Sequence, residues 1–364
     1  MHWPEAASHY IPDAAGAQKV AMLHRSRQRP GHRSDFRRMN ERELLVRLLD
    51  GPASGATLAQ AAGQTRAAVW KHVRALRAGG VGISVRPGRG YALDRPMELL
   101  DADAIDAGLA PAQRDALASL EVAWSLDSTN SELLRRETPA TGSAVLLAER
   151  QSGGRGRRGR AWASPLAANI YLSLARRFGG GLARLPGLSL VAGVASAQAL
   201  HALGFDNVRL KWPNDLVVAD GGGMRKLAGL LVEGGGEAAG PARAVIGLGL
   251  NVAMPADTAT GIDQPWIDLA TLAGGQPPSR NAVAAALLSH WLPALSLFDE
   301  VGLAPFLEPW ARFDALAGRE VLVHAHDGNH AGVALGLAAD GGLRVRIGEA
   351  ERVVHAGEVS VRPA

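Results

Sequence analysis

An arginine- and glycine-rich segment restricts the fold of this chain more than any other feature of its sequence. The segment QSGGRGRRGRAW, residues 151–162, follows the apolar run AVLLAE and precedes the apolar run NIYLSL. Short apolar runs of this kind predict buried strands. Because both ends of the segment are then held in a sheet, it is neither a free nucleic-acid-binding tail nor a linker. Glycines allow close backbone approach, and arginines suit carboxylates or phosphates. Because we expect these arginines to lack counter-charges and to repel one another, we predict an anion-holding loop that is mobile when empty.

The composition indicates a soluble protein of two or three domains. The chain has 364 residues, of which 47% are hydrophobic, enough for a sizeable core. We find no uninterrupted apolar run of the roughly 18 to 20 residues that span a bilayer, and no apolar secretory signal. A cytoplasmic protein without a membrane partner is therefore expected. The chain has no Cys, which excludes disulfides, thiolate metal sites and thioester intermediates.

The basic charge is concentrated in the first quarter of the chain. Residues 1–39 contain seven Lys or Arg against three acidic residues, and residues 40–94 contain eight against four. Such an excess is typical of a nucleic-acid-binding region. For residues 1–39 we favour the simpler interpretation of a basic, disordered extension.

Residues 40–95 have the pattern of a winged helix-turn-helix domain. Asn40 with Glu43, Ser54 and Thr65 are placed to cap three successive amphipathic helices, and an alternating hairpin turned by RPGRG follows them. In this fold the third helix enters the major groove and the wing reaches the flanking backbone. The alternatives are a solvated basic face or a protein-interaction module. The candidate DNA-binding residues are Thr65, Arg66, Lys71, Arg74, Arg86 and Arg89.

Residues 96–316 alternate predicted strands with helices. The strand LEVAW runs into SLDSTN at the start of a helix, where Ser128 and Thr129 either cap the helix or line a polar pocket. The strand AVIGLGLNV places Gly247, Gly249 and Asn251 on one face. A strand face without side chains indicates the close approach of a ligand or another backbone, or tight helix packing.

Lysine is rare in this chain, which has 35 arginines and only Lys19, Lys71, Lys211 and Lys226. An ammonium is a compact donor that the planar guanidinium fork does not replace in a tight site. Lys211 in KWPND and Lys226 in KLAGLLVE are therefore candidates for functional cations.

The segments DSTN, GRGRRGRAW, KWPNDL, KLAGLLVE and GLGLNV, in this order behind a winged helix, resemble the bifunctional biotin protein ligases of the BirA type, which also repress biotin synthesis. The resemblance covers about residues 40–364. It implies an α+β protein with a winged helix-turn-helix, a central mixed β-sheet flanked by helices as in class II aminoacyl-tRNA synthetases and biotin/lipoate ligases, and a C-terminal SH3-like barrel. The implied domains are residues 40–95, 96–316 and 317–364, and DG and GG turns between short alternating runs fit the last of these.

The reaction that this resemblance implies joins biotin to ATP as biotinyl-5′-AMP, releases pyrophosphate, and transfers biotin to one lysine of the biotin carboxyl carrier protein of acetyl-CoA carboxylase. Mg²⁺ would accompany the phosphates, with no metal site made by protein side chains. The implied catalytic residues are Lys226, Arg157, Lys211 and Asp215. The implied biotin-binding residues are Ser128, Thr129, Asn130, Gln151, Gly154, Arg155, Gly156, Arg157, Lys226 and Gly229. The implied ATP- or adenylate-binding residues are Arg157, Arg160, Trp162, Lys211, Asn214 and Asn251.

Further expectations from the resemblance are operator DNA of the biotin genes as a partner and a homodimer when biotinyl-AMP is bound. The absence of a Gly-Lys pair disfavours a P-loop phosphotransferase. A regulator without ligase activity would need a broken site, and lipoate ligases lack this winged helix. The closest alternative is a ligase whose winged helix does not act as an operator-binding repressor.

Overall fold

The structure is a computed structural model that describes residues 39–363 apart from 180, 182–184, 186, 222, 237–241, 260, 326–327 and 357–359. Residues 38–364 form one compact unit. The basic extension expected for residues 1–39 lies outside the described residues except for Met39, which is buried.

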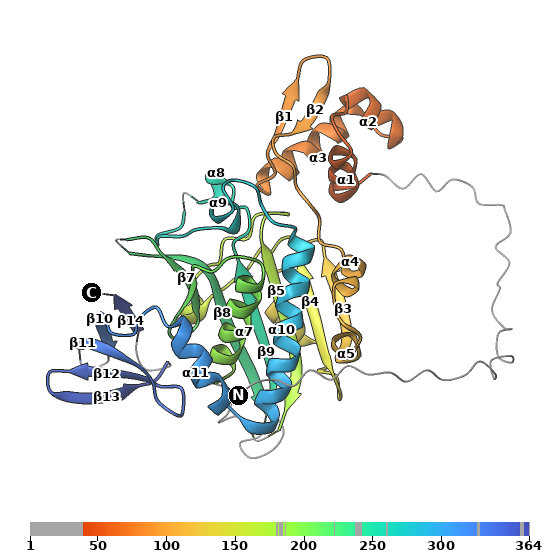
Figure 1. Cartoon of the computed structure of the whole chain (residues 1–364). Coiled ribbons are helices and arrows are strands. Elements are labelled where there is room, and N and C mark those ends of the chain that lie inside the picture. Colours follow the sequence, from red (N-terminus) through yellow and green to blue (C-terminus); the bar gives the residue numbers. More distant parts are fainter. Residues whose placement is uncertain are drawn as a thin grey trace, which may run out of the picture. The chain divides into compact units, whose positions relative to one another are not determined.

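The predicted winged helix-turn-helix is confirmed (Figure 1). Its first helix begins with a capping box, in which Oδ1 of Asn40 accepts from Glu43 N and Oε2 of Glu43 accepts from Asn40 N, both at 3.0 Å. Ser54 and Thr65 cap the next two helices as expected. The elements are α1 (Glu41–Leu49), α2 (Gly55–Ala61), α3 (Arg66–Ala78), β1 (Ile83–Arg86) and β2 (Gly90–Leu93).

The centre of the protein is a mixed seven-stranded sheet in the order β3-β4-β5-β9-β8-β7-β6. The neighbours β3 and β4 are parallel, and the other neighbouring strands are antiparallel. The predicted mixed sheet is thus confirmed. Its strands are β3 (Leu117–Ala123), β4 (Ser143–Ala148), β5 (Ile170–Phe178), β6 (Val208–Lys211), β7 (Asp215–Ala219), β8 (Met224–Gly236) and β9 (Ala242–Leu250).

Helices cover both faces of this sheet. The buried helices α7 (Leu188–Ala202) and α10 (Arg280–Val301) pack on each other and on one face, and α6 (Thr129–Arg135) lies on the other. Within the described residues, α10 alone is long and apolar enough to cross a bilayer, but half of its apolar stretch is buried in this core. The remaining helices are α4 (Ala102–Ala107), α5 (Pro111–Asp115), α8 (Ala256–Ala259), α9 (Leu269–Leu272) and α11 (Ala304–Phe313).

A buried ion pair supports the base of the arginine-rich loop. NH2 of Arg280 lies 2.8 Å from Oε2 of Glu149, and both side chains are at most 4% exposed. Arg280 also donates to the carbonyls of Glu98 and Asn169, while Oε1 of Glu149 accepts from Leu100 N. A buried ion pair is stable only when the remaining donors and acceptors of both side chains are also hydrogen-bonded. The end of β4 is therefore a rigid point from which the loop departs.

The C-terminal part is a five-stranded antiparallel sheet in the order β13-β12-β11-β10-β14. This agrees with the short strands expected there, whereas closure into an SH3-like barrel stays a prediction. The strands are β10 (Glu320–Ala325), β11 (Gly328–Leu337), β12 (Leu343–Ile347), β13 (Ala350–Val354) and β14 (Ser360–Pro363).

Candidate active site and DNA-binding face

The arginine-rich segment folds as a small hairpin between β4 and β5. Trp162 N donates to Gly154 O at 2.9 Å, and Gly156 N donates to Arg160 O at 2.7 Å. Residues 157–159 form a single 3-10 turn at the tip, with Arg158 at a φ of 57°. The segment thus lies between two strands of the sheet, as the sequence predicted, and Arg158 and Arg160 are exposed at its tip.

The predicted polar pocket residues meet at the start of α6. Ser128, Thr129 and Asn130 are buried, and Ser128 caps the helix. Oε1 of Gln151 accepts from Thr129 N at 2.8 Å and from its hydroxyl at 3.2 Å. Ser128 is therefore a helix cap and Thr129 joins the helix to the first residue of the hairpin, while the lining of a ligand pocket stays a prediction.

The strand face without side chains is covered by Trp162. A Cβ at Gly249 of β9 would lie 2.4 to 2.7 Å from three atoms of its indole ring, and one at Gly229 of β8 would lie 3.2 Å from Cζ3. Nε1 of Trp162 is buried without a hydrogen-bond partner among the described residues. The close approach expected at the glycines is thus made at Gly249 by a side chain of the hairpin itself, and at Gly247 by Asn130.

The rare lysine Lys226 lies beside this indole. Its Nζ is 2.8 Å from Oδ1 of Asp215 and 5.4 Å from the ring centre of Trp162. The side chains of Lys226 and Asp215 are 18% and 20% exposed, so the pair is reachable but partly shielded from water. Lys211 lies directly opposite Asp215 in the β6–β7 register. Two of the predicted catalytic residues are in direct contact, and a third lies next to them.

Arg157 reaches the same end of the sheet from the tip of the hairpin. Its NH1 donates to Oδ1 of Asn214 at 3.3 Å, and its NH2 donates to the carbonyl of Ala356. Burial lowers the pKa of Arg157, Arg158 lowers it further, and Asp215 opposes them. A half-buried cation beside another cation favours the arrival of an anion.

Asn251 has a supporting role in the structure. Its Nδ2 donates to Ile267 O at 3.1 Å and to Lys226 O at 3.4 Å, and Asn251 is 4% exposed. Ile267 N in turn donates to Lys226 O at 3.0 Å, which attaches the Trp266 segment to β8. The predicted contact of Asn251 with adenine stays a prediction, because the amide is already bonded to two backbone carbonyls.

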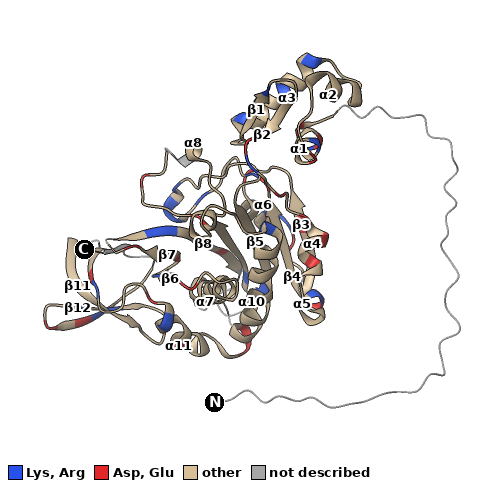
Figure 2. Cartoon of the chain, turned by 45° about the horizontal axis from the view of Figure 1, so that its top comes forward, with Lys and Arg blue, Asp and Glu red and all other residues tan. Residues whose placement is uncertain are grey.

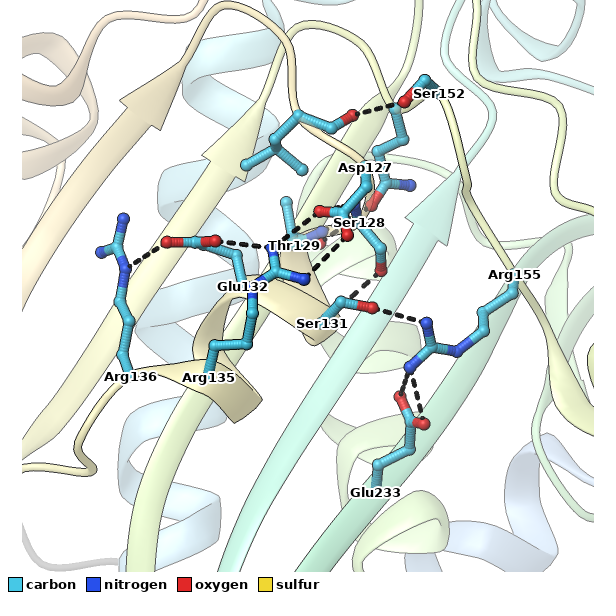
Figure 3. Close-up of polar contacts among 12 residues, drawn as sticks. Asp127, Ser128, Thr129, Ser131, Glu132, Arg135, Arg136, Ser152, Arg155 and Glu233 are labelled. Atoms are coloured by element: carbon cyan, nitrogen blue, oxygen red, sulfur yellow. Dashed lines mark hydrogen bonds and ion pairs between the residues drawn. The ribbon is translucent and has the colours of Figure 1, made fainter.

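One premise of the mobile-loop prediction is wrong for Arg155. We expected the arginines of the hairpin to lack counter-charges, but NH2 of Arg155 donates to both carboxylate oxygens of Glu233, at 2.9 and 3.2 Å, and NH1 donates to Ser131 (Figure 3). Both partners were missed in the sequence. The two-residue period of β8 is the signal that points to Glu233, since it follows Gly229 by four residues on the same strand. By contrast, Arg158 and Arg160 are exposed.

The DNA-binding candidates lie together on the winged helix. Arg66, Lys71 and Arg74 are exposed along α3, and Arg86 and Arg89 are exposed on the hairpin. Figure 2 shows Lys and Arg, in blue, on this part of the chain. Thr65 is the N-cap of α3. Trp70 was not predicted: it is 49% exposed on the same face, with the guanidinium of Arg74 4.8 Å from its ring centre. Arg77, whose Nε donates to Ile83 O, belongs to the wing support instead.

Among the described residues, no group of three or more His, Asp or Glu side chains is arranged to hold a metal ion. A divalent cation that arrives with the phosphates of ATP stays a prediction.

Comparisons with known proteins agree with this geometry. The sequence matches the Biotin/lipoate A/B protein ligase family over residues 122–251 and an HTH domain over residues 41–92. It is 41% identical over 322 residues to the bifunctional ligase/repressor BirA of Salmonella typhimurium, a match that spans 88% of this chain and 97% of that protein. The chain belongs to the family of BirA bifunctional ligase/repressors.

Further members of this BirA family extend the match. The Escherichia coli bifunctional ligase/repressor BirA is 40% identical over 323 residues, which is 88% of this chain and 97% of that protein. The biotin protein ligase of Aquifex aeolicus, solved in complex with biotin and ATP, superimposes with a TM-score of 0.57 at 25% identity, over 68% of this chain and all of that one. The expected biotin ligase, which uses biotin and ATP and carries a DNA-binding repressor domain, is confirmed.

Proposed function

We propose that this BirA-type protein carries out both ligase steps at the Trp162–Lys226–Asp215 cluster. The observation that carries the proposal is the contact between the Lys226 ammonium and the Asp215 carboxylate at 2.8 Å, beside an indole that covers bare strands. A compact cation there stabilises charge that develops where the biotin carboxylate meets the α-phosphate. Arg157 and Lys211 hold the phosphates, and Mg²⁺ enters with ATP.

In the second step Asp215 orients or deprotonates the incoming lysine amine. Asp215 lies 2.8 Å from the Lys226 ammonium, so a carboxylate freed when Lys226 turns to the adenylate is placed to accept a proton from an amine that attacks beside it. No cysteine is needed, because the amine attacks the mixed anhydride directly and AMP leaves. The carrier is a biotin carboxyl carrier protein.

For the ligand itself, Ser128, Thr129 and Gln151 bind the uncharged ureido ring, with Asn130 behind them. Gly154, Gly156 and Gly229 give the ligand close access to the backbone. Arg155 meets the carboxylate side, and Trp162, with Arg160, Asn214 and Asn251 nearby, serves the adenylate. The buried Nε1 of Trp162 supports this role.

Repression follows from the exposed basic face of α3 and the wing, Thr65 to Arg89. A single winged helix reads few base pairs, so we propose that a homodimer, formed when biotinyl-AMP is bound, is the operator-binding species. The domain limits 40–95, 96–316 and 317–364 and a cytoplasmic location belong to the same proposal.

The experiment is pyrophosphate release with biotin and MgATP, followed by transfer of labelled biotin to a carrier domain. A gel shift on the biotin-gene promoter with and without both ligands tests the repressor. Ligation without any ligand-dependent shift would leave a ligase whose winged helix is not an operator-binding repressor.

A further inference from the structure

Glu233 lies inside the polar network of the ligand pocket, yet none of the roles above uses it. The network runs from Gln151 to Thr129, whose hydroxyl lies 2.7 Å from Oγ of Ser173. Ser173 also donates to Oδ1 of Asn130 at 2.6 Å, and Nδ2 of Asn130 donates to Oε2 of Glu233 at 2.9 Å. The first residue of the arginine hairpin is thereby connected to the carboxylate at the far end of β8.

The support under this carboxylate is rigid. Asn130 is 4% exposed, and its amide packs so closely on β9 that a Cβ at Gly247 would lie 2.2 Å from Oδ1. Its Nδ2 is also bonded to the carbonyl of Leu231, two residues before Glu233 on the same strand. The Glu233 carboxylate is therefore held by the side-chain amide of Asn130, which is itself fixed by its packing on β9.

The second donor to Glu233 comes from the glycine-rich hairpin. Arg155 lies in the hairpin, 78 residues away in the chain, and its NH2 contacts both carboxylate oxygens. Figure 3 shows Arg155 reaching from the hairpin toward Ser131 on α6 and Glu233 on β8. The Arg155 and Glu233 side chains are 36% and 27% exposed. The pair thus connects a glycine-rich hairpin to the rigid wall of the sheet.

We propose that Glu233 is a positioning residue, which fixes the Arg155 guanidinium at the edge of the biotin pocket before the ligand arrives. The proposal rests on the proposed role of Arg155 in binding biotin. A guanidinium has five N–H donors, so Arg155 keeps donors for an incoming carboxylate while one nitrogen stays on Glu233. Fixing the side chain in advance removes an entropy cost from binding.

A competing role for the Glu233 carboxylate predicts the opposite effect on biotin binding. If Glu233 occupied Arg155 in place of the biotin carboxylate, its neutralisation would strengthen biotin binding. Positioning requires that neutralisation weaken it. The anchoring of Glu233 by Asn130 favours positioning, because the long Arg155 side chain adjusts to the rigid carboxylate and not the reverse.

The test is Glu233→Gln in the full-length protein, measured by pyrophosphate release over a range of biotin concentrations. The variant keeps the size of the side chain but removes its charge. Its amide NH2 group would also face one of the two donors that now contact the carboxylate, Asn130 or Arg155. We expect KM for biotin to rise about tenfold, as for a partly shielded bidentate pair, with kcat changed less than about twofold. Glu132→Gln is the matched control, since Glu132 pairs with Arg135 and Arg136 on the outer side of α6.

A double-mutant cycle separates positioning from general damage. In an Arg155→Ala background, Glu233→Gln should change KM for biotin no further. An equal rise in both backgrounds, a fall in KM, or no change in the single variant would each overturn the proposal. If Glu233→Gln fails to fold, Glu233→Asp serves instead: it retains the charge and should keep KM within about threefold of the parent, and a tenfold rise would overturn the proposal. Should Arg155→Ala itself leave KM for biotin unchanged, the proposed role of Arg155 in binding biotin falls, and the positioning role of Glu233 falls with it.

Discussion

Substituting Gly249 by Ala tests whether the contact between β9 and Trp162 shapes the adenylate site. The added Cβ would lie 2.4 Å from Cε2 of Trp162, where ordinary contact begins near 3.4 Å, so one of the two must move by about 1 Å. β9 is hydrogen-bonded to β5 and β8 on either side and has little freedom. The indole, carried by a hairpin, therefore moves.

The size of the effect follows from the cost of overpacking. Forcing one extra methyl group into a packed site costs about 1–3 kcal/mol, which corresponds to roughly 5- to 150-fold in a binding constant. We expect this loss mainly as a lower kcat/KM for ATP, measured as pyrophosphate release at saturating biotin. KM for biotin should change less, because the bond between Thr129 N and Oε1 of Gln151 does not involve the indole.

Gly235→Ala is the control, because its added Cβ on the neighbouring strand β8 meets nothing within 4 Å. In a Trp162→Ala background the Gly249→Ala change should lose its effect, since the clashing ring is gone. The reasoning is refuted if the Gly249→Ala protein keeps kcat/KM for ATP, or if its loss is as large without the indole as with it.

Three other predictions concern separate parts of the protein. Lys226→Arg should lose about 3 kcal/mol in adenylate formation, nearly as much as Lys226→Ala, because the larger fork beside Asp215 and Trp162 would push biotin or the α-phosphate out of line. Pyrophosphate release measures this loss, transfer from pre-made biotinyl-adenylate should suffer less, and near-normal activity of Lys226→Arg would show that positive charge alone suffices. Replacing Lys71 and Arg74 by Ala should weaken operator binding in gel shifts and reduce the salt slope by about 2, with ligation intact; lost ligation in a folded variant would contradict separate modules. Burial raises the pKa of Asp314, so its contribution to stability is present at low pH and is lost as pH rises above the ordinary 3.8. The melting temperature of Asp314→Asn should therefore rise relative to that of the parent as the pH is raised above this value, and a difference that does not change with pH would count against this.

Much of the fold could be predicted from local patterns. The caps at Asn40, Ser54 and Thr65 and the alternating strands reflect interactions within a few residues, which the chain encodes directly. The bare face of the strand around Gly247 and Gly249 also indicates by itself that another group approaches it closely. The nature of that neighbour was not visible in the strand, because Trp162 and Asn130 come from other segments of the chain.

The sequence by itself determined the winged helix, the alternation of the sheet, the anchored arginine loop and the residue types that an adenylating ligase requires. Only the tertiary structure decided which charges meet. Arg155 pairs with Glu233 across 78 residues, and Arg280 pairs with Glu149 across 131. Such partners depend on the order and register of the strands and on how α10 packs against them, and these are properties of the assembled core that no local periodicity contains.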